Sequence, residues 1–197
     1  MPSRVFIIRH GETEWSLSGR HTSRTDLPLT EAGERDARAV GAELRSVEFR
    51  LVLSSPALRA RRTCELAGPT RASEIEPALV EWGYGEYEGR TTAEIVRERP
   101  DWDLFRDGCP GGETPAQVSG RVDRVLARAR AQGGNVALFT HGHLAHVMAA
   151  RWIGLPVLQA RHFSVAAASV SILGLARGDS GAPVIALWNS RPGRPPA

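Results

Sequence analysis

Short apolar runs alternate with helical patterns along this chain, and this alternation limits the fold more than any other feature. The runs at residues 5–8, 51–53 and 136–139 are short and apolar, which is typical of buried strands. Between Val118 and Ala129, apolar residues recur at helical spacing, with arginines on the other face. Strands that alternate with helices predict an α/β fold, a three-layer α/β/α sandwich around a mainly parallel central sheet.

Local signals predict where the other elements begin and end. Thr30 is an expected N-cap, and Pro56 fits the first turn of a helix. Thr91-x-x-Glu94 resembles a capping box, and Thr114-Pro115-x-Gln117 is a strong helix start. The helices are expected at residues 30–45, 56–66, from 91 onward, 114–132 and 141–153. Further strands are expected at 74–80, 169–175 and 184–188, with a loop over 100–112 and a turn at 178–181.

The chain has 197 residues, which is enough for one domain with a substantial core, and it shows no internal repeat and no long linker. We therefore expect a single domain over residues 1–190 and a proline-rich, disordered tail over 191–197. No stretch is apolar and long enough to span a bilayer, and the start lacks a signal-peptide pattern, so we expect no membrane partner and a cytoplasmic location. Cys64 and Cys109 are expected to be free thiols there.

The fixed positive charges of the chain are all arginines, and the formal net charge is +3. Because a Walker A loop and a protein-kinase site both need a lysine at the phosphates, the absence of lysine excludes both classes. The arginines are interspersed with acidic residues along the helical patterns rather than gathered in one stripe. The sequence therefore predicts no nucleic-acid partner.

Two of the expected strands end in a histidine that is followed by a glycine, in Arg9-His10-Gly11 and in His141-Gly142-His143. We expect Gly11 to let the backbone turn sharply. Because ligands bind at the carboxyl ends of strands in open α/β sheets, both imidazoles meet at one edge if these strands are neighbours. Arg59, just after the second strand, lies near the same edge. Arginines and histidines around one point, with the free amides of the helix after His141, suit a phosphoryl group.

Four motifs stand in order along the chain: Arg9-His10-Gly11-Glu12-Thr13, Ser54-Ser55-Pro56-x-x-Arg59-Ala60, Glu81-x-x-Tyr84-Gly85-x-x-Glu88-Gly89 and His141-Gly142-His143. Their order and spacing resemble the histidine phosphatase superfamily, which includes phosphoglycerate mutases and many phosphatases. The resemblance covers nearly the whole chain and implies the phosphoglycerate mutase-like form of the α/β fold. Residues 81–89 and 105–114 also look like the branch that holds sedoheptulose-bisphosphatase-like enzymes and broad-specificity acid phosphatases.

The resemblance implies a role for each matching residue. His10 matches the nucleophile that becomes phosphohistidine, and Glu81 matches the proton donor. Arg9, Arg59 and His141 match the groups that grip the phosphoryl oxygens. The residues that match contacts with phosphate or substrate are Ser16, Thr22, Ser23, Tyr84, Gly142 and His143, with Ser23 in place of the usual glycine. The resemblance implies no metal and no cofactor, and a small phosphorylated metabolite as the partner.

Elementary chemistry agrees with these roles. A neutral imidazole is a competent nucleophile, and nearby arginines favour the neutral form because like charge lowers the pKa of a histidine. We therefore expect activity that extends into mildly acidic solution. Arginines also stabilise charge on the transferring group, and a glutamate in a partly dry pocket can protonate the leaving alkoxide and then activate water. The sequence thus predicts a metal-independent phosphatase that hydrolyses sugar phosphates or similar small phosphomonoesters.

Two other functions stay open. A phosphoglycerate mutase would use the same phosphohistidine, although mutases of the family carry a lysine and an insertion after the Tyr-Gly motif, and this chain has neither. The second is a non-catalytic basic protein that binds anions. A homodimer formed through a late strand is also open.

Two patterns imitate other sites. Gly83-x-Gly85-x-x-x-Gly89 is one position off a dinucleotide fingerprint, and no crossover helix is expected to open on it. His141-x-His143-x-x-His146 has the residues of a zinc pattern but no carboxylate or cysteine beside it. The sequence does not decide whether His21, His146 and His162 line a pocket or only form hydrogen bonds.

Overall fold

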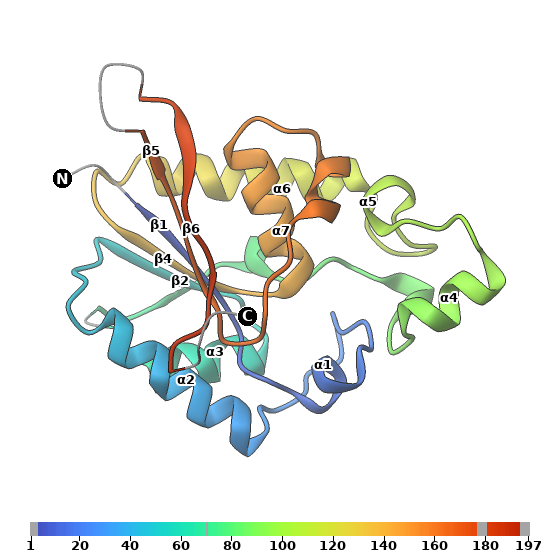
Figure 1. Ribbon diagram of the computed structural model, residues 1–197, viewed down its shortest axis with the longest axis horizontal. Coiled ribbons are helices and arrows are strands. Elements are labelled where there is room, and N and C mark those ends of the chain that lie inside the picture. The colour runs from blue at the N-terminus through green and yellow to red at the C-terminus, as the bar shows by residue number, and fades with distance from the viewer. Residues whose placement is uncertain (1–3, 70, 177–180, 194–197) are drawn as a thin grey trace.

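The computed structural model describes residues 4–69, 71–176 and 181–193, and within this part of the chain one mixed sheet lies at the centre (Figure 1). Its strand order is β3-β2-β4-β1-β5-β6. The strands are β1 (Val5–Arg9), β2 (Leu51–Ser54), β3 (Glu74–Ile75), β4 (Val136–Thr140), β5 (Val170–Leu175) and β6 (Pro183–Ser190). Strands β3, β2, β4 and β1 pair in parallel, whereas β5 and β6 pair antiparallel. The predicted mainly parallel sheet is confirmed.

Helices cover both faces of this sheet. Successive strand residues point to opposite faces, so Val5 and Ile7 belong to one hydrophobic cluster while Phe6 and Ile8 belong to the other. Helices α6 and α7 cover the first face, and α2 and α3 cover the second (Figure 1). These helices are α2 (Glu31–Leu44), α3 (Leu58–Ala67), α6 (Pro115–Arg130) and α7 (Gly142–Trp152). The predicted three-layer α/β/α sandwich is therefore confirmed.

Helix starts follow the predicted capping residues in most places. The side chains of Thr30, Thr91 and Thr114 accept hydrogen bonds from backbone amides at the starts of α2, α4 (Thr92–Glu98) and α6. Pro56 differs, because α3 begins only at Leu58 and Pro56 precedes its N-cap, Ala57. The remaining helical elements are α1 (Glu14–Ser18), α4 (Thr92–Glu98), α5 (Leu104–Asp107) and the 3-10 helices η1 (Pro77–Leu79), η2 (Gly85–Tyr87) and η3 (Val157–His162).

Three short segments differ from the sequence prediction. The strand expected over residues 74–80 ends at Ile75, because Pro77 has no N–H for a strand ladder and begins η1 instead. The loop expected over 100–112 contains α5, which the Asp103 side chain caps at the Phe105 amide. Helix α1 was not predicted, and it is short enough to lack a helical apolar pattern.

The pairing of β1 with β4 places the site. The two strands are parallel neighbours with Arg9 opposite Thr140, so His10 and His141 follow at the same carboxyl edge. Gly11 was expected to allow a sharp turn of the backbone, but its φ does not lie in the left-handed region that favours glycine. A Cβ on Gly11 would lie 2.5 Å from the carbonyl oxygen of Gly33, so glycine is needed for the close approach of α2.

Other expectations concern the ends of the chain. No helix of the described residues is long and apolar enough to cross a membrane. Of the turn predicted at 178–181, residues 178–180 lie outside the described residues. Of the disordered tail predicted over 191–197, residues 194–197 also lie outside them. A single domain over 1–190 and a homodimer through the edge strand β6 stay predictions.

Candidate active site

His10 and His141 lie together at the carboxyl edge of the sheet. Their ring centroids are 5.2 Å apart, and both side chains are buried. Nδ1 of His10 lies 2.7 Å from the carbonyl oxygen of Gly11. Because a carbonyl oxygen can only accept, Nδ1 carries the hydrogen and Nε2 keeps its lone pair. The geometry therefore assigns Nε2 of His10 as the nitrogen that is able to attack an electrophile.

The environment keeps both imidazoles neutral. Burial is the main cause that holds the pKa of His10 well below its usual value, and the positive charges of Arg59 and Arg9 lower it further. Burial also lowers the pKa of His141, followed by the charges of Arg59 and His10. The arginines act in the direction expected from sequence, but the loss of water around the buried rings acts more strongly.

Arg9 and Arg59 are held by backbone carbonyls. Arg9, at the end of β1, donates from Nη1 to the carbonyl oxygen of Val165 at 2.6 Å. Arg59, fully buried at the start of α3, donates to the carbonyl oxygens of Thr25 at 3.2 Å and Thr22 at 3.1 Å. These bonds use only the terminal nitrogens of each guanidinium. The Nε of both side chains is buried and has no partner.

Arg9 Nε, Arg59 Nε and His141 Nδ1 are buried and lack a hydrogen-bond partner among the described residues, as does Nδ1 of His146 on the cavity wall. His141 uses its other nitrogen, Nε2, which lies 2.8 Å from Oγ of Ser55. A buried group without a partner costs about 1–3 kcal/mol, and native proteins keep few of them. An anion with several acceptor oxygens is the kind of group that supplies partners for such nitrogens.

Glu81 borders the same cavity as His10, and its side chain is buried. Its Oε1 accepts from the amides of Trp82 and Leu144, both at 2.9 Å. Among the described residues, its Oε2 accepts from the amide of His143 alone, at 3.0 Å, and so keeps a lone pair that Oε1 does not. The carboxyl group is therefore fixed with one oxygen able to carry or release a proton.

The start of α7 corrects one expectation. His141 is the N-cap of α7, but its side chain makes no capping hydrogen bond. Glu81 accepts the amides of His143 and Leu144 instead. The prediction that the amides of this helix start bind the ligand anion is therefore wrong for His143 and Leu144, because a carboxylate from another segment already occupies these two amides.

Gly142 lies between two charged groups. A Cβ on Gly142 would lie 3.4 Å from Cζ of Arg9 and 3.6 Å from Oε2 of Glu81. The guanidinium of Arg9 and the carboxyl oxygen of Glu81 therefore both border the position of the missing side chain. A larger residue at Gly142, which the resemblance marks as a substrate contact, would press on both groups.

A cavity of about 240 Å³ opens from this edge. Of the residues predicted from sequence, its wall includes Arg9, His10, Ser16, Thr22, Glu81, Tyr84, Gly142 and His143. Arg59 and His141 do not line it and are fully buried. Ser23 is not brought into this cavity: its amide donates to the Glu88 carboxylate at 2.9 Å, and it borders a neighbouring cavity.

Uncharged aromatic and imidazole groups form the outer wall of the cavity. The hydroxyl of Tyr84 and Nδ1 of His143 are 2.5 Å apart, and the His21 ring lies 4.6 Å from the Tyr84 ring. His146 stacks on Phe105, with ring centroids 5.9 Å apart. Burial lowers the pKa of His21 and His143 to about 4 and that of His146 to about 3, so these rings are neutral near pH 7.

The structure shows which of the three histidines left open by the sequence line the cavity. His21 and His146 line the cavity, whereas His162 ends η3 and is exposed. The zinc pattern does not form a site, and no group of three or more His, Cys, Asp or Glu among the described residues could hold a metal ion. The glycine pattern opens no crossover helix either, as expected from its spacing, because Gly85 begins the three-residue η2.

Sequence reasoning missed several residues that hold the site. Ser55 is the partner of His141, and its place in the Ser54–Ala60 motif was a signal that could have indicated it. Arg121 was expected on the polar face of its helix, but it is 7% exposed and contacts the segment that carries Glu81. No local signal separates Arg121 from the exposed arginines of the same helix.

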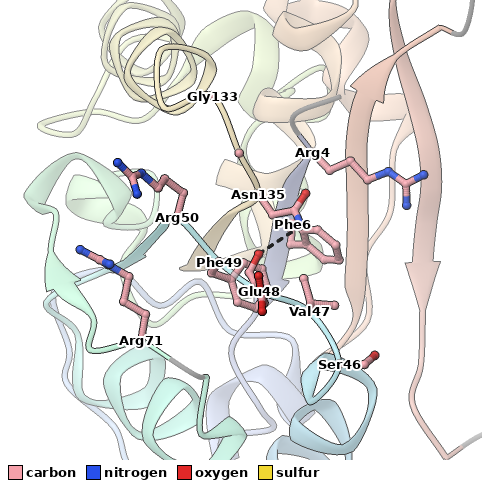
Figure 2. Close-up of a pocket in the computed structure, with 11 residues that line it drawn as sticks. Arg4, Phe6, Ser46, Val47, Glu48, Phe49, Arg50, Arg71, Gly133 and Asn135 are labelled. Atoms are coloured by element: carbon pink, nitrogen blue, oxygen red, sulfur yellow. Dashed lines mark hydrogen bonds between the residues drawn. The ribbon is translucent and has the colours of Figure 1, made fainter. Parts of the chain in front are cut away.

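A larger cavity, of about 880 Å³, lies at the opposite edge, where the parallel strands begin. Its lining includes Arg4, Phe6, Phe49, Arg50 and Arg71 (Figure 2). Figure 2 shows the side chains of Arg4 and Arg71 pointing in opposite directions. Among the described residues that line it there is no histidine and no buried nitrogen without a partner. The larger cavity therefore lacks the groups that phosphoryl chemistry needs.

Comparison with known proteins agrees with this geometry. A family model described as the histidine phosphatase superfamily (branch 1) matches residues 5–191. The chain belongs to this superfamily.

Its relatives include named phosphatases. An acid phosphatase of Mycobacterium tuberculosis is 39% identical over 179 residues, covering 89% of this chain and 88% of the relative. A sedoheptulose 1,7-bisphosphatase of Saccharomyces cerevisiae is 37% identical over 193 residues, covering 80% and 71%. The solved structure of the protein from an M. tuberculosis open reading frame superimposes with a TM-score of 0.89 at 36% identity. The match covers 95% of this chain and 97% of that one. The predicted activity, that of a phosphoric monoester hydrolase, agrees with these names.

Proposed function

We propose that this protein hydrolyses small phosphomonoesters through a phosphohistidine on His10, with Glu81 as the general acid and base. The observation that carries the proposal is the set of unpartnered buried nitrogens on Arg9, Arg59 and His141, beside the neutral ring of His10. A phosphoryl group offers acceptor oxygens for these nitrogens and a phosphorus atom for His10 to attack. Inorganic anions without a leaving group would satisfy the nitrogens but would make no use of His10 and Glu81.

In the first step, the lone pair of His10 Nε2 attacks phosphorus, and the bond from phosphorus to the leaving oxygen breaks. The hydrogen bond from Nδ1 to the Gly11 carbonyl stabilises the positive charge that the ring gains. Arg9 and Arg59 stabilise the nonbridging oxygens, which is the main contribution that a protein makes to phosphoryl transfer. The proton of Glu81 passes to the leaving oxygen, and the product departs as a neutral alcohol.

In the second step, the Glu81 carboxylate takes a proton from a water molecule. The water oxygen attacks phosphorus, the nitrogen–phosphorus bond breaks, and phosphate leaves with His10 restored. We assign Oε2 as the atom that exchanges the proton, because it accepts one amide hydrogen bond while Oε1 accepts two. One carboxyl group thus serves both steps, as a donor and then as an acceptor.

The outer cavity favours a leaving group that is uncharged and carries hydroxyls. Its imidazoles are neutral and offer both donors and acceptors. Arg20 also lines it, but its guanidinium donates to the Gly89 carbonyl at 2.6 Å and lies 3.9 Å from Glu94. A volume of about 240 Å³ restricts the substrate to a small metabolite. We therefore propose sugar monophosphates and similar compounds.

We also propose a reducing, cytoplasmic setting for this reaction. Cys64 and Cys109 are both free thiols and both buried. Burial raises the pKa of Cys64 to about 11 and that of Cys109 to about 12, so neither thiol is reactive near neutral pH. Free, inert thiols are typical of proteins that stay in a reducing compartment.

Phosphate release in the presence of a chelator tests the proposal. We expect purified protein to hydrolyse p-nitrophenyl phosphate and glycerol phosphate at the same rate with and without EDTA, since the reacting groups are all side chains of the chain. Loss of turnover on chelation would contradict the metal-free mechanism. With 3-phosphoglycerate, transfer of the phosphoryl group to the 2-hydroxyl without phosphate release would favour the mutase instead.

A further inference from the structure

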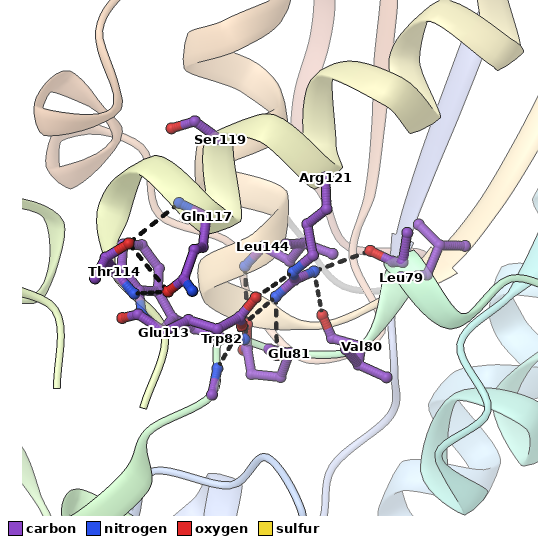
Figure 3. Close-up of polar contacts among 12 residues, drawn as sticks. Leu79, Val80, Glu81, Trp82, Glu113, Thr114, Gln117, Ser119, Arg121 and Leu144 are labelled. Carbon is purple, nitrogen blue, oxygen red and sulfur yellow. Dashed lines mark hydrogen bonds and ion pairs between the residues drawn. The ribbon is translucent and has the colours of Figure 1, made fainter. Parts of the chain in front are cut away.

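Arg121 is a buried arginine that does not line the active-site cavity. It lies on α6, and only 7% of its surface is exposed. Figure 3 shows its guanidinium between the side chain of Glu113 and the backbone of the segment that carries Glu81. A charge in such a place is costly unless it is fully bonded, so its contacts indicate what it is there to hold.

All five N–H groups of the Arg121 guanidinium have an acceptor. Nη1 donates to the carbonyl oxygens of Ala78 at 2.9 Å and Val80 at 2.8 Å. Nη2 donates to the carbonyl oxygen of Glu81 at 3.0 Å. The remaining N–H groups bind both carboxylate oxygens of Glu113, each at 2.8 Å. Three of the five bonds thus fix the backbone at and just before the general acid.

Glu113 fixes the other side of the same segment. Its Oε2 accepts a hydrogen bond from the Gly83 amide at 2.8 Å, and its own backbone amide donates to the carbonyl oxygen of Gly83 at 2.8 Å. Its carbonyl oxygen accepts from Nε1 of Trp82 at 2.9 Å. The ion pair of Arg121 and Glu113 therefore holds the chain both before and after Glu81.

The backbone and the carboxylate of Glu81 are thus fixed by different elements. Arg121 fixes its backbone carbonyl, and the first amides of α7 fix its carboxylate. Transfer of a proton needs the carboxyl oxygen within hydrogen-bond reach of the leaving oxygen, and a displacement of about 1 Å can cost about 10²-fold in rate. The position of Oε2 therefore depends on the placement of a backbone that Arg121 determines.

We propose that Arg121 and Glu113 form a positioning pair for the general acid, and that they set the efficiency of proton transfer without touching the substrate. This proposal rests on the proposed role of Glu81. Lysine cannot replace Arg121 in this role, because a single ammonium has three N–H groups and no planar fork for the Glu113 carboxylate. The pair determines how well the enzyme acts on substrates whose leaving group needs a proton.

A series of phosphomonoesters with graded leaving groups tests this proposal. With 2,4-dinitrophenyl phosphate the leaving oxygen needs no proton, whereas with glycerol phosphate it does. For Arg121→Lys we expect kcat/KM on glycerol phosphate to fall by about 10²-fold, the scale of general acid catalysis, while kcat/KM on 2,4-dinitrophenyl phosphate changes much less. The ratio kcat/KM is the quantity to compare, because it reports phosphoryl transfer to His10 and excludes the later attack of water, in which Glu81 acts on every ester alike.

Arg130→Lys is the matched control. Arg130 lies on the same helix and also donates to a backbone carbonyl oxygen, that of Trp152 at 3.0 Å, at the end of α7 rather than in the Glu81 segment. We expect this variant to keep the leaving-group dependence of the unaltered enzyme. An equal loss of kcat/KM on all esters in Arg121→Lys would overturn the proposal, because it would mean that the pair only stabilises the fold.

Two more variants keep the result interpretable. Glu113→Gln keeps an oxygen for the Gly83 amide but weakens the bond to Arg121, so we expect a smaller loss with the same dependence on leaving group. If Arg121→Lys does not fold, Glu113→Gln becomes the test of the proposal. An equal loss of kcat/KM on all esters in Glu113→Gln would then contradict the proposal. Glu81→Gln separates the proposed role of Glu81 from the proposed role of the pair. If Glu81→Gln shows no selective loss on esters with poor leaving groups, Glu81 is not the general acid. If Glu81→Gln shows that selective loss and the Arg121 and Glu113 variants do not, the pair does not position Glu81.

Discussion

The two edges of the central sheet both gather arginines, and they differ in how far those arginines are removed from water. At the carboxyl edge, Arg59 is fully buried beside two buried histidines, and its Nε has no partner. At the amino edge, Arg4, Arg50 and Arg71 are all exposed around the larger cavity. The amino-edge cavity has the greater volume, about 880 Å³ against about 240 Å³.

The difference teaches that volume and charge do not by themselves make a phosphoryl site. An exposed guanidinium is already hydrated, so an anion gains little by replacing the water. A buried guanidinium has lost that water, and its free N–H group interacts with an anion through a medium of low effective dielectric. Burial also keeps His10 neutral, so the same loss of water prepares both the nucleophile and the groups that stabilise its target.

The largest expected effect comes from removing the nucleophile. We expect His10→Ala to lower kcat by at least about 10³-fold, because the variant lacks the imidazole on which the proposed phosphoenzyme forms. It should also abolish phosphoenzyme labelling, measured with radioactive substrate and quenching in alkali, where a phosphohistidine is stable. His162→Ala, at an exposed ring on η3, is the control and should change neither quantity. Labelling that persists in His10→Ala would place the nucleophile elsewhere.

The next effect compares the two edges directly. We expect Arg59→Ala to reduce kcat/KM by about 10²–10³-fold, the range seen when one transition-state donor is lost. Arg50→Ala removes an equal charge from the amino edge and should leave kcat/KM unchanged. Phosphate release at low substrate concentration measures both, and circular dichroism checks that each variant is folded. Equal losses in the two variants would mean that long-range charge, rather than buried contact, attracts the substrate.

Much of the carboxyl edge could be predicted from the sequence because its signals are local. The apolar run before Arg9 and the run before His141 each indicate a buried strand, and buried parallel strands bring their ends to one edge. The capping threonines at 30, 91 and 114 likewise bond to amides three residues on, so short patterns suffice to place them.

The contacts that hold Glu81 could not be predicted, because each joins residues far apart in the chain. Arg121 differs from the exposed arginines of α6 only through what the fold packs against it. The occupation of the α7 amides by Glu81 depends on where η1 ends, and η1 lies in a segment predicted as a strand. Ser23 matched a motif position, but the Glu88 carboxylate binds its amide and holds it outside the cavity wall.

The smallest effect is a pH dependence that belongs to the carboxyl edge alone. Burial keeps His10 neutral below pH 6.5, so catalysis by folded protein should continue into mildly acidic solution. Stability should behave differently. Because the pKa of His21 and His143 is about 4 in the folded protein, the unfolded chain binds more protons between pH 6.5 and pH 4. The free energy of unfolding should therefore decrease as the pH falls through this window.

Each such histidine should contribute a slope of about 1.4 kcal/mol per pH unit to the free energy of unfolding, lost on acidification. His146 offers the sharpest test, because burial lowers its pKa to about 3 and its ring stacks on Phe105. We expect His146→Phe to make the decrease between pH 6.5 and pH 5 less steep by about one histidine's share, since an aromatic ring keeps the packing and removes the titration. His162→Phe, at an exposed ring, should leave the slope unchanged. Urea unfolding at several pH values measures both slopes, and equal slopes in the two variants would mean that burial of the cavity wall does not control the response to acid.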